Sequence, residues 1–527
     1  MTQASVVFPA GPDGRRSTSA FGRAVVADAL RGTDPAGALG AEQETNWRSG
    51  YLTHFRRLIE AGLTSTDAAL SIAGDGLESV HRRMRAVLAD GSETGIDDLL
   101  TTPAGDGLRT VAVRGTAEPG TELALPYRGS VLRGDELLRR LDAWVSAGII
   151  EPSCADAVGA VAAHPEWLSL PGRTVAALGA GSEIGPLPVL LRWGATAAGI
   201  DLPGQRLWER VLDMARAGAG TLLVPVSNGQ RAETGTGAEA GSPAEEDPAA
   251  SEGSAGLARS AGTDLNAAVP ELADWLAGLG GGLVLGNYVY ADGAANLAVC
   301  AAADTLTLRL AAARPDLAIA FLATPTDVFA VPADAVRQSV RAYEQRPMAV
   351  KLAVRPLRAL SGGRLLRRAY VPGADPGISD CLVAQQGPNY ALAKRLQRWR
   401  ACVARQAGMT VSLNVAPPTR TRSVVRNRVL AAAYAGAHRF GAEVFEPDTC
   451  RVLMAALLVH DLCAGSAAGT ESGPGPEGGP GQGPGSIRQP WQDEAYAAAH
   501  GGLWRIAYAP RSALGLAALL GYGSARS

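Results

Sequence analysis

The sequence feature that most constrains the fold is an alternation of short apolar runs and longer amphipathic stretches that begins at Arg173. The apolar runs have the length of strands and fall at residues 174–178, 197–200, 221–226, 282–285, 318–322, 410–413 and 503–508. Stretches with helical spacing lie at residues 187–193, 207–217, 267–279, 295–313, 390–406, 423–438 and 448–462. Strands that alternate with helices predict a parallel sheet with helices on both faces. The sequence therefore favours an α/β fold with a doubly wound, Rossmann-like sheet.

The length of the chain, 527 residues, exceeds that of most single domains, so we expect more than one part. Residues 1–170 carry apolar residues at helical spacing and one strand-like run at 110–113, which predicts a mostly helical N-terminal accessory domain. We expect residues 171–463 to form the Rossmann-like domain. The other expected parts are a basic insert at 328–380, disordered low-complexity segments at 229–262 and 464–489, and a last strand with a C-terminal tail at 490–527.

The overall charge is nearly balanced, with 49 basic and 51 acidic residues, so no global field marks the chain for nucleic acid or for a membrane. Residues 1–16 lack the charged region and apolar run of a signal peptide. No run reaches the ~18 apolar residues that a membrane-spanning helix needs. The six cysteines stand singly and the histidines show no metal-binding spacing, so we expect no metal. These patterns predict a cytoplasmic protein.

A glycine-rich turn follows the first expected strand and comes directly before a helical stretch. Such a turn lets the backbone approach a pyrophosphate, and a helix N-terminus adds amide donors. The residues expected to contact a nucleotide cofactor are therefore Gly179, Gly181, Ser182, Ile184 and Gly185. The alternative is an ordinary tight turn, because the chain contains 64 glycines.

Asp201 ends the second expected strand, about twenty residues after the turn, where dinucleotide-binding chains carry an acidic residue. A carboxylate at this place can accept hydrogen bonds from the ribose hydroxyls of an adenosine. It would repel a 2′-phosphate, so NAD(H) is a more suitable cofactor than NADP(H). Asp201 therefore favours the dinucleotide interpretation of the turn.

Tyr390 and Lys394 are four residues apart in a predicted helix, so they share one face. A tyrosine with its ordinary pKa of about 10 is a poor base at neutral pH. A neighbouring ammonium favours the phenolate, which makes the tyrosine a usable general acid or base. The pair alone is also consistent with a plain contact on a helix surface.

The order of these features resembles that of the short-chain dehydrogenase/reductase family. The glycine turn precedes Tyr390-x-x-x-Lys394, which is followed by a strand and by Asn414-Val415-Ala416-Pro417-Pro418-Thr419. Residues 439–461 resemble the late segment of the family, in which an acidic helix start leads into an apolar helix. The resemblance covers about half of the chain. Each motif alone is weak, and the specificity comes from their occurrence in the correct order.

The resemblance implies an oxidoreductase that transfers a hydride between a nicotinamide cofactor and a small carbonyl or alcohol substrate. Tyr390 would exchange a proton with the substrate oxygen, while Lys394 would bind the cofactor ribose and lower the tyrosine pKa. Pro417 and Thr419 would contact the cofactor. So would Asn287, which follows the fourth expected strand. The resemblance also implies a homo-oligomer.

Three departures from the family pattern affect the expected site. Glu183 stands where the family has a glycine, and this places a carboxylate near the phosphates. The catalytic serine has no single counterpart: Thr324 and Thr326 follow the fifth expected strand, whereas Ser379 lies in the insert before the tyrosine helix. All three hydroxyls remain candidates for stabilising the oxyanion. The relay asparagine of the family has only Asn296 as a match.

Basic residues gather in the insert and along the tyrosine helix. They are Lys351, Arg355, Arg358, Arg364, Arg367, Arg368, Lys394, Arg395, Arg398 and Arg400. One interpretation is a solvated charged face. The other is a docking site for an anionic handle of the substrate, such as a coenzyme A phosphate, or for an acidic carrier protein. Nucleic acid is disfavoured because aromatic residues are not interleaved with the basic ones.

Two other functions fit part of the pattern. A non-catalytic nucleotide-binding protein would keep the fold and explain the missing serine and asparagine. A methyltransferase that uses S-adenosylmethionine shares the glycine turn and the acidic residue after the second strand. The segment from Tyr390 to Thr419 argues against the methyltransferase.

Overall fold

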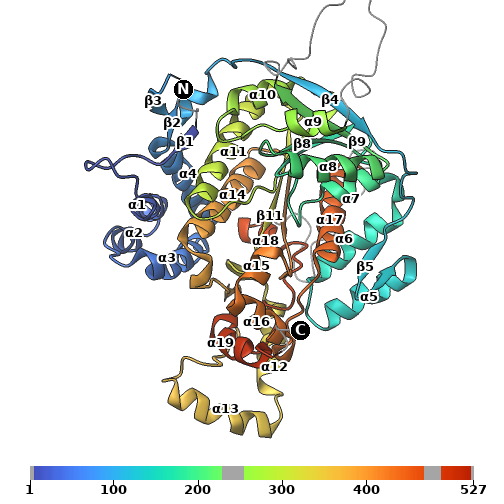
Figure 1. The fold of residues 1–527 in the computed structure, drawn as a ribbon. Coiled ribbons are helices and arrows are strands. Elements are labelled where there is room, and N and C mark those ends of the chain that lie inside the picture. Colours follow the sequence, from blue (N-terminus) through green and yellow to red (C-terminus); the bar gives the residue numbers. More distant parts are fainter. Residues whose placement is uncertain (1–4, 89, 228–253, 468–487, 524–527) are drawn as a thin grey trace, which may run out of the picture. The chain divides into compact units, whose positions relative to one another are not determined.

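The structure is a computed structural model that describes residues 5–88, 90–227, 254–467 and 488–523. The chain is an α/β protein with a mostly parallel seven-stranded sheet in the order β14-β11-β10-β7-β8-β9-β4 (Figure 1). The strands are β4 (Leu108–Arg114), β7 (Arg173–Leu178), β8 (Thr196–Ile200), β9 (Thr221–Ser227), β10 (Gly282–Asn287), β11 (Ala318–Ala323) and β14 (Val411–Val415). The predicted α/β class is confirmed. Most of both low-complexity segments, residues 229–253 and 468–487, lies outside the described residues.

The order of the strands identifies the switch point, where successive strands stop being added on one side of β7 and start being added on the other. When β7, β8, β9, β10, β11 and β14 are numbered 1 to 6 along the chain, they lie in the order 3-2-1-4-5-6. This is the order found in doubly wound dinucleotide-binding sheets. β7 pairs in parallel with β8 on one side and with β10 on the other. Ligands of such sheets bind beyond the carboxyl ends of the strands at this switch point, which here follows Leu178 and Asn287.

The seventh strand is β4, which pairs antiparallel with β9 in the register Val111↔Val224. The sequence predicts a strand here but assigns it to the accessory domain, because a local pattern does not indicate a pairing partner. The predicted strand at 503–508 is wrong. Gly501 and Gly502 have φ angles of 63° and 89°, which bend the chain immediately before this segment. The apolar segment is buried without a ladder: Trp504 stacks on His500 with ring centroids 4.7 Å apart.

The chain divides into two compact units, each assembled from three separate stretches. Unit 1 consists of Met1–Pro9, His81–Thr121 and Pro165–Ala320, and unit 2 of Ala10–Val80, Glu122–His164 and Phe321–Ser527. Residues 1–170 therefore contribute to both units, and the predicted N-terminal helical domain is not confirmed. The expected boundaries at residues 170 and 463 do not coincide with this division.

Unit 1 contains the strands around the switch point and a small antiparallel sheet of β1 (Ser5–Val7), β2 (Arg85–Val87) and β3 (Glu93–Gly95). Its helices are α7 (Leu187–Arg192), α8 (Gln205–Ala217), α9 (Ser254–Ser260), α10 (Val269–Ala277) and α11 (Ala294–Ala313). By length and composition α11 could cross a membrane, although no such run was expected from the sequence. Its most apolar window is 67% buried, as in the core helix of a globular unit.

Unit 2 is largely helical. Its helices are α1 (Thr18–Arg31), α2 (Pro35–Glu42), α3 (Trp47–Gly62), most of α4 (Thr66–Arg83), α5 (Gly134–Ser146), α6 (Pro152–Ala163), α12 (Ala333–Glu344), α13 (Met348–Leu360), α14 (Pro388–Gln406), α15 (Arg422–Arg426), α16 (Arg428–Gly436), α17 (Pro447–Ala467), α18 (Pro490–Ala495) and α19 (Pro510–Gly521). Two hairpins accompany them, β5 (Leu125–Tyr127) with β6 (Ser130–Leu132), and β12 (Val328–Val331) with β13 (Gly377–Asp380). The basic insert at 328–380 thus contains regular helices and strands.

Candidate functional site

The glycine turn of unit 1 connects β7 to α7 at the switch point. Gly179 has a φ angle of 88°, and a Cβ atom there would lie 2.9 Å from the carbonyl oxygen of Tyr288. The amides of Gly179 and Ala180 donate to the carbonyl of Ile200 at 2.8 and 3.0 Å. Ser182 donates its amide to the carbonyl of Gly179 at 2.9 Å. Only glycine fits at position 179, because any side chain would collide with the backbone that follows β10.

Asp201 holds the turn from the end of β8. Its Oδ2 accepts the amide of Gly181 at 2.8 Å, and its Oδ1 accepts the amide of Leu202 at 2.8 Å. Burial raises the pKa of the Asp201 carboxyl above its usual range, although both amides and the charge of Arg210 act in the opposite direction. Each carboxylate oxygen has a second lone pair, so further hydrogen bonds to a ligand remain chemically available.

The rest of the turn departs from a standard phosphate site. α7 contains six residues, and Pro186 and Pro188 at its start have no amide hydrogen to donate. Fewer aligned peptide dipoles and fewer donors weaken the attraction for a pyrophosphate. A Cβ atom at Gly185 would lie 3.1 Å from Cβ of Ser182, so this glycine keeps the turn narrow.

Asn287 closes β10 directly opposite Leu178 and is 4% exposed. The loop that follows is held by Asn296, whose Oδ1 accepts the amide of Ala291 at 3.0 Å. Asn296 therefore acts in unit 1 as a loop anchor at the start of α11. The glycine turn, Asp201 and Asn287 all lie at the carboxyl ends of neighbouring strands, so the structure brings the unit 1 candidates to one edge.

The tyrosine–lysine pair lies in the first turns of α14 in unit 2. Lys394 donates from Nζ to the carbonyl of Leu322 on β11 at 3.0 Å and to Oε1 of Gln397 at 3.0 Å. The first contact directs the ammonium to β11, the strand that precedes the candidate threonines, and the second is within α14. Tyr390 is half-buried, one helical turn before the lysine.

Thr324 and Thr326 form a hydroxyl pair just after β11. Their Oγ1 atoms are 2.8 Å apart, and Gln386 donates from Nε2 to Oγ1 of Thr326 at 2.6 Å. Gln386 lies four residues before Tyr390. The structure therefore connects the end of β11 to the tyrosine helix at two places, through Lys394 and through Gln386.

Ser379, the third hydroxyl candidate, has a different environment. It lies in β13 opposite Phe329, is 2% exposed, and its Oγ is 3.3 Å from Sγ of Cys381. Burial raises the pKa of the Cys381 thiol to about 12, which keeps that thiol neutral. We interpret Ser379 as part of the hairpin core, so Thr324 and Thr326 are the better candidates.

Asn414, Pro417 and Thr419 make hydrogen bonds within the protein. Asn414 donates from Nδ2 to Oδ2 of Asp461 at 2.8 Å, and Ser412 donates to the same oxygen at 2.7 Å. Thr419 donates its hydroxyl to the carbonyl of Pro417 at 2.8 Å, which fixes the turn after β14. Asp461 in α17 was not singled out from the sequence, because nothing in its spacing indicates that it meets β14.

A buried charge cluster is the main polar feature that the sequence analysis missed. Asp327 accepts from Arg395 at 2.8 Å and from Arg398 at 2.6 Å, and Glu494 accepts from Arg398 at 2.5 Å. Burial and the charge of Arg398 lower the pKa of Arg395 to about 10. Burial disfavours the charge on Asp327, but both guanidinium groups hold its pKa below the usual range. The spacing of Arg395 and Arg398 on one helix face was the available signal.

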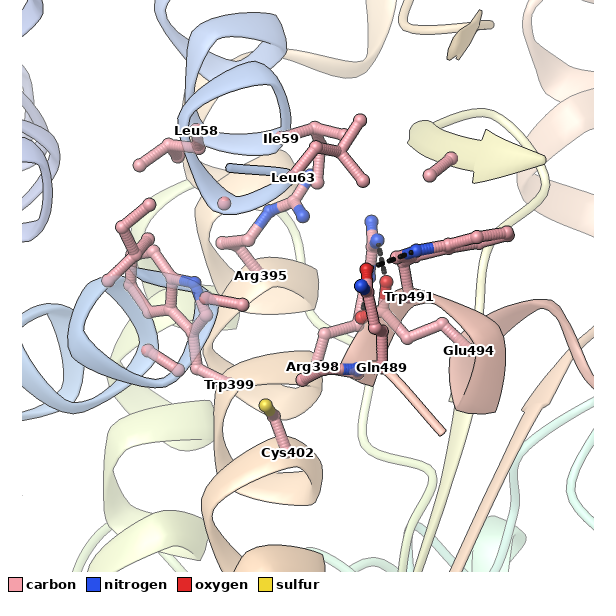
Figure 2. Close-up of a pocket in the computed structure, with 16 residues that line it drawn as sticks. Leu58, Ile59, Leu63, Arg395, Arg398, Trp399, Cys402, Gln489, Trp491 and Glu494 are labelled. Atoms are coloured by element: carbon pink, nitrogen blue, oxygen red, sulfur yellow. Dashed lines mark hydrogen bonds and ion pairs between the residues drawn. The ribbon is translucent and has the colours of Figure 1, made fainter. Parts of the chain in front are cut away.

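This charge cluster borders a small cavity of about 60 Å³ (Figure 2). Ile59 of α3 and Leu63, which follows the helix, form an apolar wall, and Trp491 forms another side. Among the described residues, no acceptor lies within hydrogen-bond distance of Nε of Arg395. The lining contains neither Tyr390 nor a candidate hydroxyl. The cavity is therefore separate from the predicted catalytic residues.

A larger cavity of about 280 Å³ lies beside Arg420, the residue that follows Thr419. Glu443 on its wall accepts from Tyr127 at 2.8 Å and from Arg128 at 2.8 Å. Burial raises the pKa of Tyr434, another lining residue, to about 12.

In the part of the chain that the structure describes, no group of three or more His, Cys, Asp or Glu side chains is placed to hold a metal ion. No protein-family model, curated protein or solved structure matches the chain.

Proposed function

We propose that the chain binds an adenine dinucleotide, NAD(H) in preference to NADP(H), and works as an oxidoreductase on a carbonyl or alcohol. The observation that carries this proposal is the hydrogen bond from the Gly181 amide to Asp201 at the switch point of a 3-2-1-4-5-6 sheet. A narrow glycine turn and a carboxylate at the next strand end are the two parts that such a cofactor needs.

The cofactor preference follows from charge. A ribose with free 2′- and 3′-hydroxyls can donate to the Asp201 carboxylate, whereas a 2′-phosphate would face a like charge. Glycine at positions 179 and 181 lets the turn pack closely against Tyr288 and Asp201, which keeps it narrow. The proline-rich start of α7 supplies fewer amides than usual, so we expect a moderate affinity.

The chemical step is assigned to unit 2. NAD(H), when bound, supplies or accepts the hydride. Tyr390 would give a proton to the substrate oxygen during reduction and take it back during oxidation. Lys394 would hold a positive charge near the phenol, and Thr324 or Thr326 would donate a hydrogen bond to the oxyanion.

A second candidate is a nucleotide-binding protein without catalysis. It is favoured by the contacts of Lys394, whose ammonium already donates to Leu322 and Gln397. Asn414, which follows the tyrosine helix as the resemblance requires, is likewise bound to Asp461. Catalysis would require the Lys394 ammonium to give up these partners.

The test begins with the purified full chain and calorimetric titration of NADH, NADPH and S-adenosylmethionine. We expect NADH to bind more tightly than NADPH, and S-adenosylmethionine not to bind. A panel of aldehydes and ketones with NADH absorbance as readout then separates the two candidates. Turnover supports the oxidoreductase; NADH binding without turnover supports the non-catalytic protein. Binding of S-adenosylmethionine alone would overturn both.

A further inference from the structure

Helix α13 of unit 2 presents apolar side chains to solvent. Met348, Leu352 and Leu360 are 67%, 54% and 88% exposed. Val354 is 8% exposed and packs in a small core with Leu366 and other buried residues. Because an α-helix has 3.6 residues per turn, Met348 and Leu352 share a face that lies roughly opposite Val354. Val354 therefore anchors the helix, while Met348 and Leu352 lie on a side that is apolar and exposed.

Cationic residues surround this exposed face. From Arg346 to Ala374 the sequence contains seven lysine and arginine residues and no aspartate or glutamate. Arg368 is occupied within the unit, since it donates to Glu344 at 2.6 Å. Arg355, Arg364 and Arg367 are exposed. Figure 1 shows α13 at the edge of unit 2, beside α12 and α19.

We propose that α13 is an interfacial helix that binds the surface of an anionic lipid bilayer. Met348, Leu352 and Leu360 would enter the boundary between head groups and acyl chains. Arg355, Arg364 and Arg367 would meet the lipid phosphates. Exposed apolar side chains on a surface helix, with cations on the helix and in the segment that follows it, are typical of membrane-surface segments. The expectation of no membrane partner rested on the balanced total charge, which conceals this local asymmetry.

Two other classes of anionic partner fit less well. An acidic protein would be attracted by the arginines but gives no reason for a leucine that is 88% exposed. A single-stranded nucleic acid is usually bound by aromatic side chains that stack on its bases, and α13 contains none. The bilayer is the partner that uses both the charge and the apolar face.

Co-sedimentation of the full chain with vesicles tests the proposal. We expect binding to vesicles of equal phosphatidylglycerol and phosphatidylcholine, and little binding to phosphatidylcholine alone. Each cation near an anionic surface changes the binding constant by about fivefold, so the triple variant R355Q/R364Q/R367Q should bind roughly 100-fold more weakly. The variant M348S/L352S/L360S should bind at least about tenfold more weakly, because the buried apolar area is lost.

Matched controls use residues of unit 2 outside this segment. R48Q/R139Q/R337Q removes three exposed arginines, and Leu39→Ser removes a leucine that is 52% exposed. Both should bind vesicles like the parent, and all variants should keep its unfolding midpoint, since the altered side chains are exposed. Equal binding to both vesicle types, or unchanged binding of both triple variants, would overturn the proposal. Binding to polyglutamate or to DNA but not to the anionic vesicles would also overturn it.

Discussion

The glycine turn of unit 1 and the tyrosine helix of unit 2 obtain their candidate sites in different ways. In unit 1 the groups that would meet a ligand are backbone amides and one carboxylate, and the strand order places them at a common edge. In unit 2 the candidates are side chains, and several already have partners: Lys394 on Leu322, Thr326 on Gln386 and Asn414 on Asp461. A binding edge thus follows from topology, whereas a catalytic group depends on which neighbour its side chain selects.

The largest expected effect concerns the buried charges of unit 2 and would show that they are structural. Asp327→Asn removes the counter-charge of Arg395 and Arg398, both of which are at most 2% exposed. We expect the free energy of unfolding to fall by about 3–5 kcal/mol, because a buried cation is left uncompensated. Urea unfolding measures this loss. Asp142→Asn, at an exposed position on α5, should change it by less than about 0.5 kcal/mol. Equal effects of the two variants would contradict the structural role.

A smaller effect, on turnover, asks whether the tyrosine helix carries chemistry at all. If Tyr390 is the proton donor, Tyr390→Phe should reduce kcat by at least ~100-fold while NADH affinity stays within twofold of the parent. The control Tyr522→Phe removes a phenol that is 57% exposed near the C-terminus and should leave turnover unchanged. If the parent is active and Tyr390→Phe keeps that activity, Tyr390 is not the proton donor and α14 has a structural role.

The third prediction tests whether the edge in unit 1 binds a ribose. Asp201→Asn keeps an acceptor for one backbone amide but removes the charge, so NADH affinity should fall about tenfold, the scale of one charged hydrogen bond. The ratio of NADH affinity to NADPH affinity should also become smaller. The control is Asp213→Asn, which changes an exposed aspartate in α8, the helix that follows Asp201. Unchanged NADH affinity in the Asp201 variant would remove the ribose contact from the proposal.

The pH dependence of NADH binding is a second test of whether the Asp201 carboxylate contacts the ribose. Because burial raises the pKa of Asp201, its carboxylate becomes protonated at a higher pH than an ordinary aspartate. Affinity for a ribose that donates to the carboxylate should therefore be present at neutral pH and decline as the pH falls through this raised pKa. Asp201→Asn should show no such decline, and calorimetry at several pH values provides the comparison.

The smallest expected effect belongs to a histidine in unit 1. Nδ1 and Nε2 of His81 lie 2.6 Å from Asp97 and 2.8 Å from Asp304. Burial lowers the pKa of His81, but the bonds and charges of Asp304 and Asp97 outweigh it and raise the pKa overall. The resulting stabilisation is complete below the unfolded-state pKa of about 6.5 and is lost as the pH rises through the folded pKa.

We expect the stability of the parent to decrease across that window, because the charged imidazole that Asp304 and Asp97 stabilise is lost as the pH rises. Thermal unfolding between neutral and alkaline pH measures it, and His81→Gln should flatten the dependence. His438, an exposed histidine of unit 2, provides the control His438→Gln. A parent whose stability increases over the same window would contradict the assigned charge of His81.

The sequence predicted the sheet well where strands are apolar and the chain is regular. β7, β8, β9, β10, β11 and β14 appeared as short apolar runs separated by helices, and all six are confirmed. β4 was recognised as a strand but not as a member of this sheet, since pairing with β9 joins segments far apart in sequence. The segment at 503–508 has strand-like composition, but its apolar residues are buried by side-chain contacts after two bent glycines.

The candidate site was predictable only in part, for a related reason. Gly179 and Asp201 were identified because backbone geometry dictates their spacing, and the structure places them around one turn. The contact of Asn414 with Asp461 and the cluster of Asp327 with two arginines depend on long-range packing. No local spacing determines which buried carboxylate a given side chain will meet.

The composition of each unit from three separate stretches has a consequence for the biogenesis of the protein. Unit 1 contains no residue beyond Ala320, whereas unit 2 combines helices near the N-terminus with residues as late as the C-terminal region. At translation rates of about 5–20 residues per second, the remaining 207 residues (527 − 320) take roughly 10–40 s to synthesise. During that interval α1 and α3 can contact each other and α2 but not their later partner α14. In a nascent chain stalled far enough beyond Ala320 for that residue to leave the ribosome, unit 1 should therefore resist proteolysis while chaperones bind the early helices of unit 2.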